Sequence, residues 1–194
     1  MRRAAIVEQN RYLVRRQRSF RAAADWLADR FARFDEVAAV ALTGSVARPL
    51  WKEVPRFRQF RRERIEVWHE CGDLDLVLWL SSLERLDDLR RARDSALRRA
   101  DEAGRNFGLA GFQVDCFLFE PGSDRYLGRL CSFNQCPKGK PHCETPGCGA
   151  VPFLKQHEGF QLWPGLLQGS LLLYRRGEGR LARAADLPDV PEDG

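Results

Sequence analysis

Two stretches of the chain place apolar residues at steps of three and four, the spacing of a helix with one buried face. In the first, from about Ala5 to Phe34, arginines separate the apolar positions Leu13, Phe20, Ala24, Leu27 and Phe31. In the second, residues 81–104, the apolar face is made by Leu83, Leu86, Leu89, Ala96 and Leu97. Ser81 or Ser82 is suited to cap the start of this stretch, and Gly104 to end it. The pattern predicts two amphipathic helices.

Three short apolar runs lie between and after these helices. They are EVAAVALTGS (36–45), LDLVLWL (74–80) and GFQVDCFLFE (111–120), whose length and composition are typical of buried strands. FQLWPG (160–165) and SLLLYRRG (170–177) are candidates for further strands, and VARPLW (46–51) for one helical turn. The order helix, strand, strand, helix, strand predicts an α/β or α+β fold, with a small mixed sheet flanked by helices.

Length and composition suit one domain. The chain has 194 residues, 44% of them hydrophobic and 30% charged, which is enough for one core inside a charged surface. No run approaches the ~18 apolar residues of a membrane span, and the basic N-terminus lacks the apolar stretch of a signal peptide. We therefore expect a single cytoplasmic domain over 1–194 without membrane contact, ending in a flexible acidic tail over 186–194.

Arginine supplies nearly all of the positive charge. The formal net charge is +5, from 28 arginines and four lysines against 27 acidic residues. The densest basic stretch, residues 52–66, carries six basic and three acidic groups around Phe57 and Phe60. Charge with interleaved aromatic rings is typical of nucleic-acid binding, although a solvated flap has the same composition. Region 51–70 is therefore a candidate nucleic-acid contact.

Three aspartates interrupt the apolar runs. Asp73 and Asp75 stand two residues apart, so a strand projects both side chains from one face. Asp115 lies in the third run, and its carboxylate reaches the same place if the two strands pair. Converging carboxylates repel one another unless a cation lies among them, and oxygen ligands favour Mg²⁺ or Mn²⁺. The alternative is that Asp73 caps a strand, Asp75 pairs with an arginine and Asp115 is incidental.

The turn at Gly44-Ser45 adds groups that suit a phosphate. Glycine leaves backbone N–H groups accessible, and the serine adds a hydroxyl. Two divalent ions about 3.5–4 Å apart form the clamp that enzymes use for in-line attack at phosphorus. Together with the carboxylates, the turn indicates phosphoryl-transfer chemistry.

The ordered segments LTGSVAR, GDLDLVL and VDCFLF resemble the nucleotidyltransferase fold of the DNA polymerase beta superfamily, in particular the minimal nucleotidyltransferases of prokaryotes. That family has an apolar strand ending in Gly-Ser, an Arg a few residues later, an Asp-x-Asp strand and a third Asp on a later strand. The matching positions, within residues 37–119, are Gly44, Ser45, Arg48, Asp73, Asp75 and Asp115.

The resemblance implies transfer of NMP from an NTP, with ATP the first candidate, to a hydroxyl acceptor. Asp73 and Asp75 would bind both metal ions, while Asp115 would bind the catalytic ion and help to deprotonate the acceptor. The triphosphate would be bound by Gly44, Ser45 and Arg48.

Two features depart from the family pattern. The 27 residues between Ser45 and Asp73 are far more than the family usually has, and the insert is the basic region 51–70. The helical C-terminal domain that holds the acceptor in antibiotic-modifying members is missing or reduced. The acceptor therefore stays open between a small molecule, a protein and RNA.

Four of the six cysteines fall in residues 131–148, with the spacing C-x4-C-x6-C-x4-C. Thiolates bind Zn²⁺ tetrahedrally, and this loop has too few apolar residues to be ordered without a metal. We predict a zinc-knuckle-like insertion with a structural Zn²⁺, in which His142 or His157 can replace one ligand of the set Cys131, Cys136, Cys143 and Cys148. Free thiols, disulfides and an iron–sulfur cluster are the alternatives.

Two hypotheses of function follow. The first is a metal-dependent nucleotidyltransferase with a zinc-stabilised loop. The second is a catalytically inactive zinc-binding module that uses its basic insert to bind nucleic acid or a protein partner, as in a toxin–antitoxin system.

Overall fold

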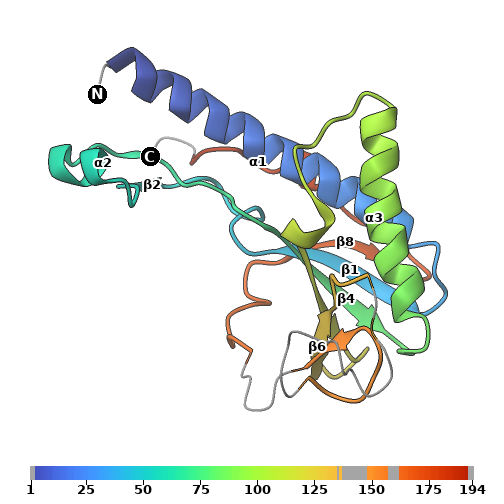
Figure 1. Ribbon diagram of the computed structural model, residues 1–194. Helices are drawn as coiled ribbons and strands as arrows, with labels where there is room; N and C mark the ends of the chain where they lie inside the picture. Colours follow the sequence, from blue (N-terminus) through green and yellow to red (C-terminus); the bar gives the residue numbers. More distant parts are fainter. Residues whose placement is uncertain (1–2, 135, 137–147, 157–161, 192–194) are drawn as a thin grey trace.

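A computed structural model describes residues 3–134, 136, 148–156 and 162–191 of the chain. It is a mixed α/β protein whose seven-stranded sheet has the order β7-β6-β5-β4-β1-β8-β9, with α1 and α3 against one face (Figure 1). The predicted sheet flanked by helices is confirmed. No helix in this part of the chain is both long and apolar enough to cross a membrane. The elements are α1 (Arg3–Phe31), β1 (Val37–Thr43), β2 (Lys52–Glu53), α2 (Arg58–Glu63), β3 (Val67–Trp68), β4 (Leu74–Leu80), α3 (Leu86–Glu102), β5 (Val114–Phe119), β6 (Tyr126–Leu130), β7 (Leu154–Lys155), β8 (Leu171–Arg175) and β9 (Gly179–Arg180).

The main core lies between the sheet and the two long helices. Alternate residues of each central strand point into it, as the period of a strand requires, and α1 and α3 contribute the leucine, alanine and phenylalanine positions of their predicted faces. The opposite face of the sheet carries a smaller cluster, in which the segment 162–170 covers part of the strands. Its buried members are Ala41, Val77, Phe119 and Leu166.

Helix α3 connects β4 to β5, which run parallel to each other, as parallel neighbours require a crossover. The helix begins at Leu86, and the residue before it, Arg85, makes no side-chain cap. Ser82 instead accepts a hydrogen bond from the Glu84 N–H at 3.2 Å in the preceding turn. The predicted serine cap is therefore wrong, because Ser82 stabilises a turn before the helix.

Two further local predictions are wrong. Residues 44–47 form turns and VARPLW contributes no helix; Pro49 lacks the N–H that a continuing helix would use. Of the stretch FQLWPG, residues 162–165 are in coil and turn rather than in a strand, and residues 160–161 lie outside the described part. SLLLYRRG does form a strand, β8.

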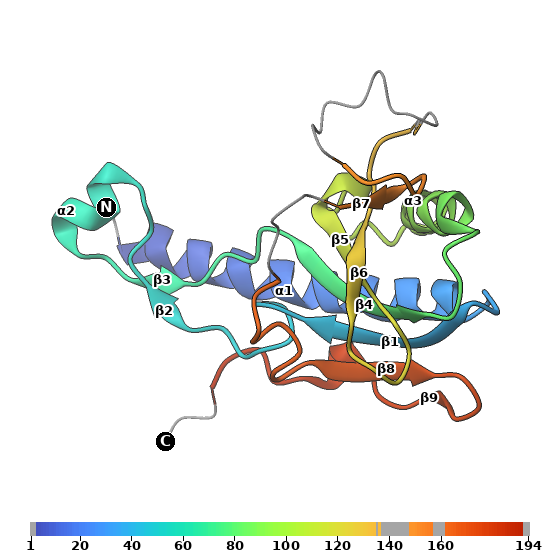
Figure 2. The same cartoon turned by 90° about the horizontal axis from the view of Figure 1, so that it is seen from below.

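Residues 51–70 form an arm that projects past the sheet along the first half of α1 (Figure 2). Strands β2 and β3 pair at its base, with Lys52 opposite Trp68, and α2 lies beyond them. The Trp68 N–H donates to Asn10 Oδ1 of α1 at 2.8 Å. Helix α1 has 29 residues and therefore spans about 43 Å, long enough to support the arm outside the core.

Arg21 of α1 is 1% exposed and joins the turn after β1 to the end of the chain. Its guanidinium donates to the carbonyl oxygens of Val46 at 3.0 Å, Arg48 at 2.9 Å and Leu187 at 2.8 Å, and lies 3.4 Å from the Asp189 carboxylate. Burial lowers the pKa of Arg21, and the charge of Asp189 opposes that shift. Part of the segment expected as a tail, 186–194, thus holds Arg21, while residues 192–194 lie outside the described part.

Replacing Arg21 should destabilise the chain strongly. Arg21→Ala leaves several buried carbonyl oxygens without a donor, so we expect the free energy of unfolding to fall by about 3 kcal/mol or more. Arg18→Ala is the matched control, because Arg18 pairs with the same Asp189 at 2.6 Å but is 65% exposed; its loss should stay below about 1 kcal/mol. Urea unfolding measures both, and equal losses would contradict the role given to Arg21.

Candidate active site

Three neighbouring strands bring the predicted aspartates and the glycine turn to one end of the sheet. Thr43 of β1 lies opposite Asp75 of β4, and Asp75 lies opposite Asp115 of β5. Paired residues on adjacent strands project to the same face, so the two carboxylates are neighbours across the parallel pair. The pairing on which the sequence argument depended is therefore present.

Both carboxylates project from the sheet face that the long helices leave open. Leu74 and Leu76 are fully buried beneath the helices, so Asp75 between them points the opposite way. Asp115 alternates in the same manner with its buried neighbours in β5. Asp73 precedes the first residue of β4 and is exposed. The site thus has two carboxylates fixed by strands and a third on the adjoining loop.

Gly44 lies directly against the Asp75 carboxylate. Its backbone φ is +73°, and a Cβ built at this position would lie 2.2 Å from Asp75 Oδ2. Both the backbone conformation and the contact require glycine. Ser45 follows in the same turn, and the exposed Arg48 donates from its guanidinium to the Gln168 carbonyl at 3.3 Å. The predicted glycine, serine and arginine therefore lie at the same end of the sheet as the carboxylates.

The surroundings of Asp75 disfavour the ionised form of its carboxyl group. Burial raises its pKa to about 6, with further contributions from the charges of Asp115 and Asp73, whereas Arg129 lowers it. Among the described residues Asp75 forms no ion pair. The alternative that Asp75 merely pairs with an arginine therefore has no support in this structure.

Arg129 of β6 is a site residue that the sequence analysis missed. Its Nη1 donates to Asp115 Oδ2 at 2.5 Å, and its side chain is 32% exposed. Arg129 lies opposite Phe117 in the β5–β6 ladder, two residues along β5 from Asp115. Only the strand pairing identifies it, because nothing in the local sequence separates Arg129 from the other 27 arginines.

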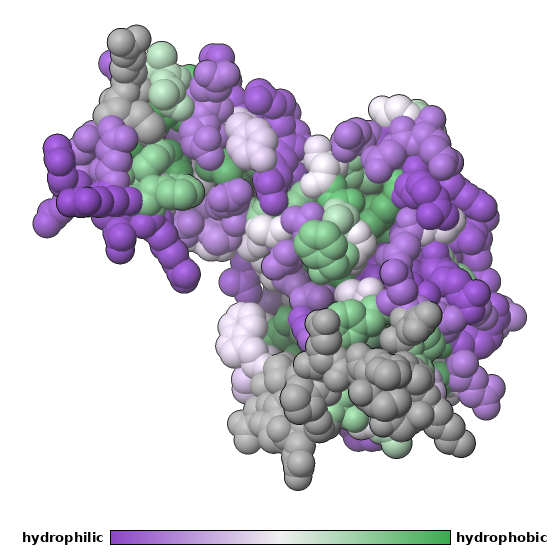
Figure 3. Space-filling view, in the orientation of Figure 1, coloured by the Kyte–Doolittle hydropathy of each residue, from purple (hydrophilic) through white to green (hydrophobic). Residues whose placement is uncertain are grey.

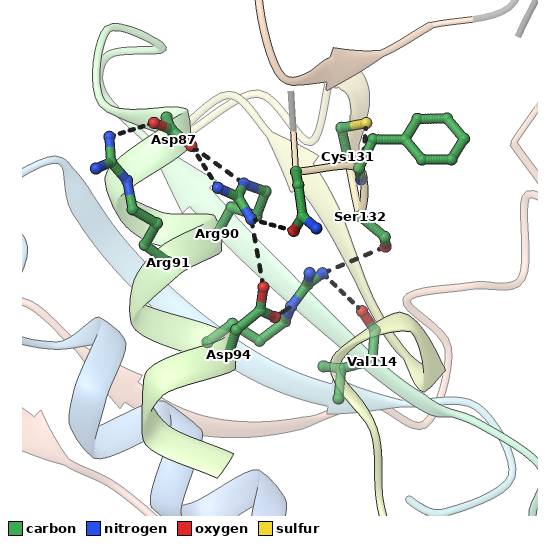
Figure 4. Close-up of polar contacts among 10 residues, drawn as sticks. Asp87, Arg90, Arg91, Asp94, Val114, Cys131 and Ser132 are labelled. Carbon is green, nitrogen blue, oxygen red and sulfur yellow. Dashed lines mark hydrogen bonds and ion pairs between the residues drawn. The ribbon is translucent and has the colours of Figure 1, made fainter. Parts of the chain in front are cut away.

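A polar network on α3 holds the start of β5 (Figure 4). Arg93, 1% exposed, donates to the carbonyl of Val114 at 3.3 Å, immediately before Asp115, and to Asp94 at 2.9 Å. A Cβ on Gly111 would lie 2.3 Å from the same Asp94 oxygen. The backbone that precedes β5 therefore packs closely against this carboxylate. Arg93 also reaches Ser132 at 3.5 Å. The network joins α3, β5 and the segment that follows β6.

The carboxylates do not form a ready-made metal site. Within the described ranges, no three or more His, Cys, Asp and Glu side chains are arranged to hold a metal ion. The donor chemistry of Asp75 and Asp115, adjacent carboxylates with a third carboxylate near enough to raise the Asp75 pKa, suits Mg²⁺ or Mn²⁺. Asp75 and Asp115 are thus two candidate ligands side by side, with the exposed Asp73 on the adjoining loop.

The cysteine loop is described only at its two ends. Cys131 follows β6 directly and is 8% exposed, and its N–H donates to the Phe153 carbonyl at 2.8 Å. The Cys148 thiol donates to the Leu154 carbonyl at 3.5 Å. Cys136 is half-buried, whereas Cys143, with His142 and His157, lies outside the described residues. The zinc site therefore stays a prediction. Its first and last candidate ligands lie near the paired strands β6 and β7, Cys131 directly after β6 and Cys148 in contact with Leu154 of β7.

Comparison of the chain with protein-family models, with curated proteins and with solved structures gives no match.

The raised pKa of Asp75 predicts a pH-dependent effect of Asp75→Asn. Between about pH 4 and 6 the folded chain binds a proton that the unfolded chain releases, so ionisation of Asp75 destabilises the fold as the pH rises. The shift from 3.8 to about 6 corresponds to about 3 kcal/mol at most. Urea unfolding in EDTA should show Asp75→Asn near neutral at pH 4 and stabilising at pH 8. The exposed Glu102→Gln should change little at either pH, and a pH-independent effect of Asp75→Asn would contradict the prediction.

Proposed function

We propose that the chain is a metal-dependent nucleotidyltransferase with a site of the DNA polymerase beta superfamily type, which transfers NMP from an NTP to a hydroxyl acceptor. The observation that best supports this function is the placement of Asp75 beside Asp115 and against the turn at Gly44. Three segments remote in sequence supply these groups at one end of the sheet. An incidental aspartate would not explain why burial and like charge are tolerated there.

The chain's own residues divide into two groups in this proposal. The turn at Gly44-Ser45 offers backbone N–H groups and a hydroxyl to the β- and γ-phosphates, and the exposed Arg48 neutralises their charge. Asp75 and Asp115 would hold Mg²⁺ with Asp73, whose exposed loop position leaves room for its side chain to turn. When bound, Mg²⁺ supplies positive charge at the α-phosphate and at the leaving oxygens.

The proposed reaction forms one bond at phosphorus and breaks another, and a carboxylate of the site takes up the proton that is released. The acceptor oxygen forms a bond to the α-phosphorus while the bond from that phosphorus to the bridging oxygen breaks, releasing pyrophosphate. Asp115 accepts the acceptor's hydroxyl proton. Arg129, which contacts Asp115, supplies positive charge on the same side of the site and would stabilise the departing phosphates. Positioning and charge account for the chemistry, as is general for phosphoryl transfer.

Nucleotide binding tests the proposed function. Isothermal titration of each NTP in the presence of Mg²⁺ should show binding that requires the metal. Asp75→Asn and Asp115→Asn each remove a direct ligand, so each should weaken binding by more than the roughly 10–100-fold cost of losing a supporting residue.

The matched control for this titration is Glu102→Gln, an exposed carboxylate at the end of α3, which should leave the affinity unchanged. Circular dichroism keeps loss of folding separate from loss of a ligand. Absence of NTP binding by the folded, unmodified chain would refute the enzyme and leave the inactive binding module. Unchanged NTP affinity in both aspartate variants would refute the assignment of Asp75 and Asp115 to the metal-binding site.

We also propose that the cysteine loop holds one structural Zn²⁺. Elemental analysis should give about one zinc per chain. Cys148→Ser should lower that content and the stability of the loop, whereas Cys116→Ser, at a buried core position, should leave zinc bound in the folded fraction. A folded chain purified without zinc, and unchanged by a chelator, would contradict the proposal.

A further inference from the structure

The arm, residues 51–70, is rooted in the proposed site. It begins three residues after Arg48 and ends three residues before Asp73. Its two ends are joined by a hydrogen bond from the His69 N–H to the Trp51 carbonyl at 2.8 Å. Arg16 of α1 donates to the Cys71 carbonyl at 2.8 Å and holds the segment that leads from the arm back to β4. A ligand lying along the arm would therefore lead to the turn and the carboxylates.

The tip of the arm carries an excess of positive charge, because residues 56–64 contain five arginines and one acidic residue, Glu63. Helix α2 has no buried residue, and within the described chain none of its arginines forms an ion pair; nor do the flanking Arg56 and Arg64. Two acidic side chains near the base have partners within the protein, since Glu53 is hydrogen-bonded to His69 at 2.9 Å and Glu70 lies 3.8 Å from Arg16. The charge of Arg62 contributes to a lowered pKa of Glu63. The arginines of the tip that form no ion pair among the described residues are Arg56, Arg58, Arg61, Arg62 and Arg64.

Aromatic rings accompany this charge. Phe57 is 69% exposed, and its ring centroid lies 6.1 Å from that of Phe60. At the base of the arm, the 39% exposed Trp51 stacks on His69 at 3.8 Å. Figure 3 shows apolar side chains among hydrophilic ones on the projecting lobe at the upper left. A hollow of about 560 Å³ lies between the arm and α1, with a lining that includes Leu13, Pro55, Phe57 and Phe60.

We propose that the arm binds a single-stranded nucleic acid and delivers a terminal hydroxyl of that strand to the site as the acceptor. The second half of this inference depends on the proposed nucleotidyltransferase function; the binding does not. Unpaired arginines beside exposed rings suit a flexible strand, whose phosphates meet the cations while its unpaired bases stack on the rings. A duplex hides the faces of its bases, and a small anion would not need the rings.

Fluorescence anisotropy in EDTA, without NTP, tests the binding. We expect labelled 12-nucleotide RNA and DNA single strands to bind more tightly than the matching duplexes, and the comparison of the two single strands identifies the preferred sugar. Arg61→Ala/Arg62→Ala should weaken binding roughly 25-fold at 0.1 M salt and lower the salt slope by about 1.4, if each arginine contacts one phosphate. Phe57→Ala should weaken it about fivefold or more through lost stacking.

The matched control is Arg98→Ala/Arg99→Ala, an adjacent pair of exposed arginines on α3 without ion pairs among the described residues. It should change the affinity less than about twofold. Three results would each contradict the arm as the binding surface for a single strand. They are equal losses of affinity from the two double variants, equal affinity for duplex and single strand, and no binding at 50 mM salt. Far-ultraviolet circular dichroism of each variant checks that a loss of affinity does not come from unfolding.

Transfer of label from an α-labelled NTP tests the acceptor. With Mg²⁺ present, a single strand with a free terminal hydroxyl should become labelled, and a strand blocked at both ends should not. Arg61→Ala/Arg62→Ala should lose this labelling at low strand concentration while keeping NTP binding, whereas Asp75→Asn should lose NTP binding and keep strand binding. A bound strand that stays unlabelled despite bound NTP would overturn the acceptor assignment, and failure of NTP binding alone would overturn only the proposed enzyme.

Discussion

Two carboxylates, Asp75 and Asp115, are held side by side across a pair of parallel strands, and both burial and like charge oppose the ionisation of Asp75 by raising its pKa. Asp75 and Asp115 cannot separate, because the residues on either side of each belong to the core beneath the helices. Such a pair persists only when the surrounding structure holds both side chains firmly in place. The leucines of β4, the crossover helix α3 and the Arg93 network at the start of β5 supply that constraint, and the arginine of β6 offsets part of the charge.

The open face of the sheet follows from the same arrangement. Both long helices cover one face, so the polar residues at the ends of β1, β4 and β5 are left to the other face, partly screened by the segment 162–170. Thr43 donates its hydroxyl hydrogen bond to the Leu166 carbonyl, which attaches that segment beside the turn. Gly44 lies against Asp75 and Arg129 against Asp115, while Arg48 contacts the Gln168 carbonyl of the same covering segment.

The arm would give the proposed site a surface for its acceptor. It is inserted between the two halves of the site, and it gains stability by pairing β2 with β3 and by resting on α1. Its arginines gather at the tip, while Glu53 and Glu70 near its base contact His69 and Arg16. The position of the insert thus connects the proposed chemistry to the proposed strand-binding surface.

The sequence by itself determined the two amphipathic helices and the three central strands, because periodicity is a local property. The six residues of the candidate site were predicted from the spacing of the aspartates, the Gly-Ser turn and the resemblance to a family, and their roles stay a prediction. The sequence did not predict that the basic insert folds as a hairpin on α1, since that depends on contacts with residues such as Asn10 more than 50 positions away. Nor could it single out Arg129 among 28 arginines or Arg21 as a buried tie to the chain's end. The pairing of β4 with β5, which makes two aspartates into neighbours, was decided by the tertiary structure alone, because strand order is fixed by how the helices and the sheet share one core.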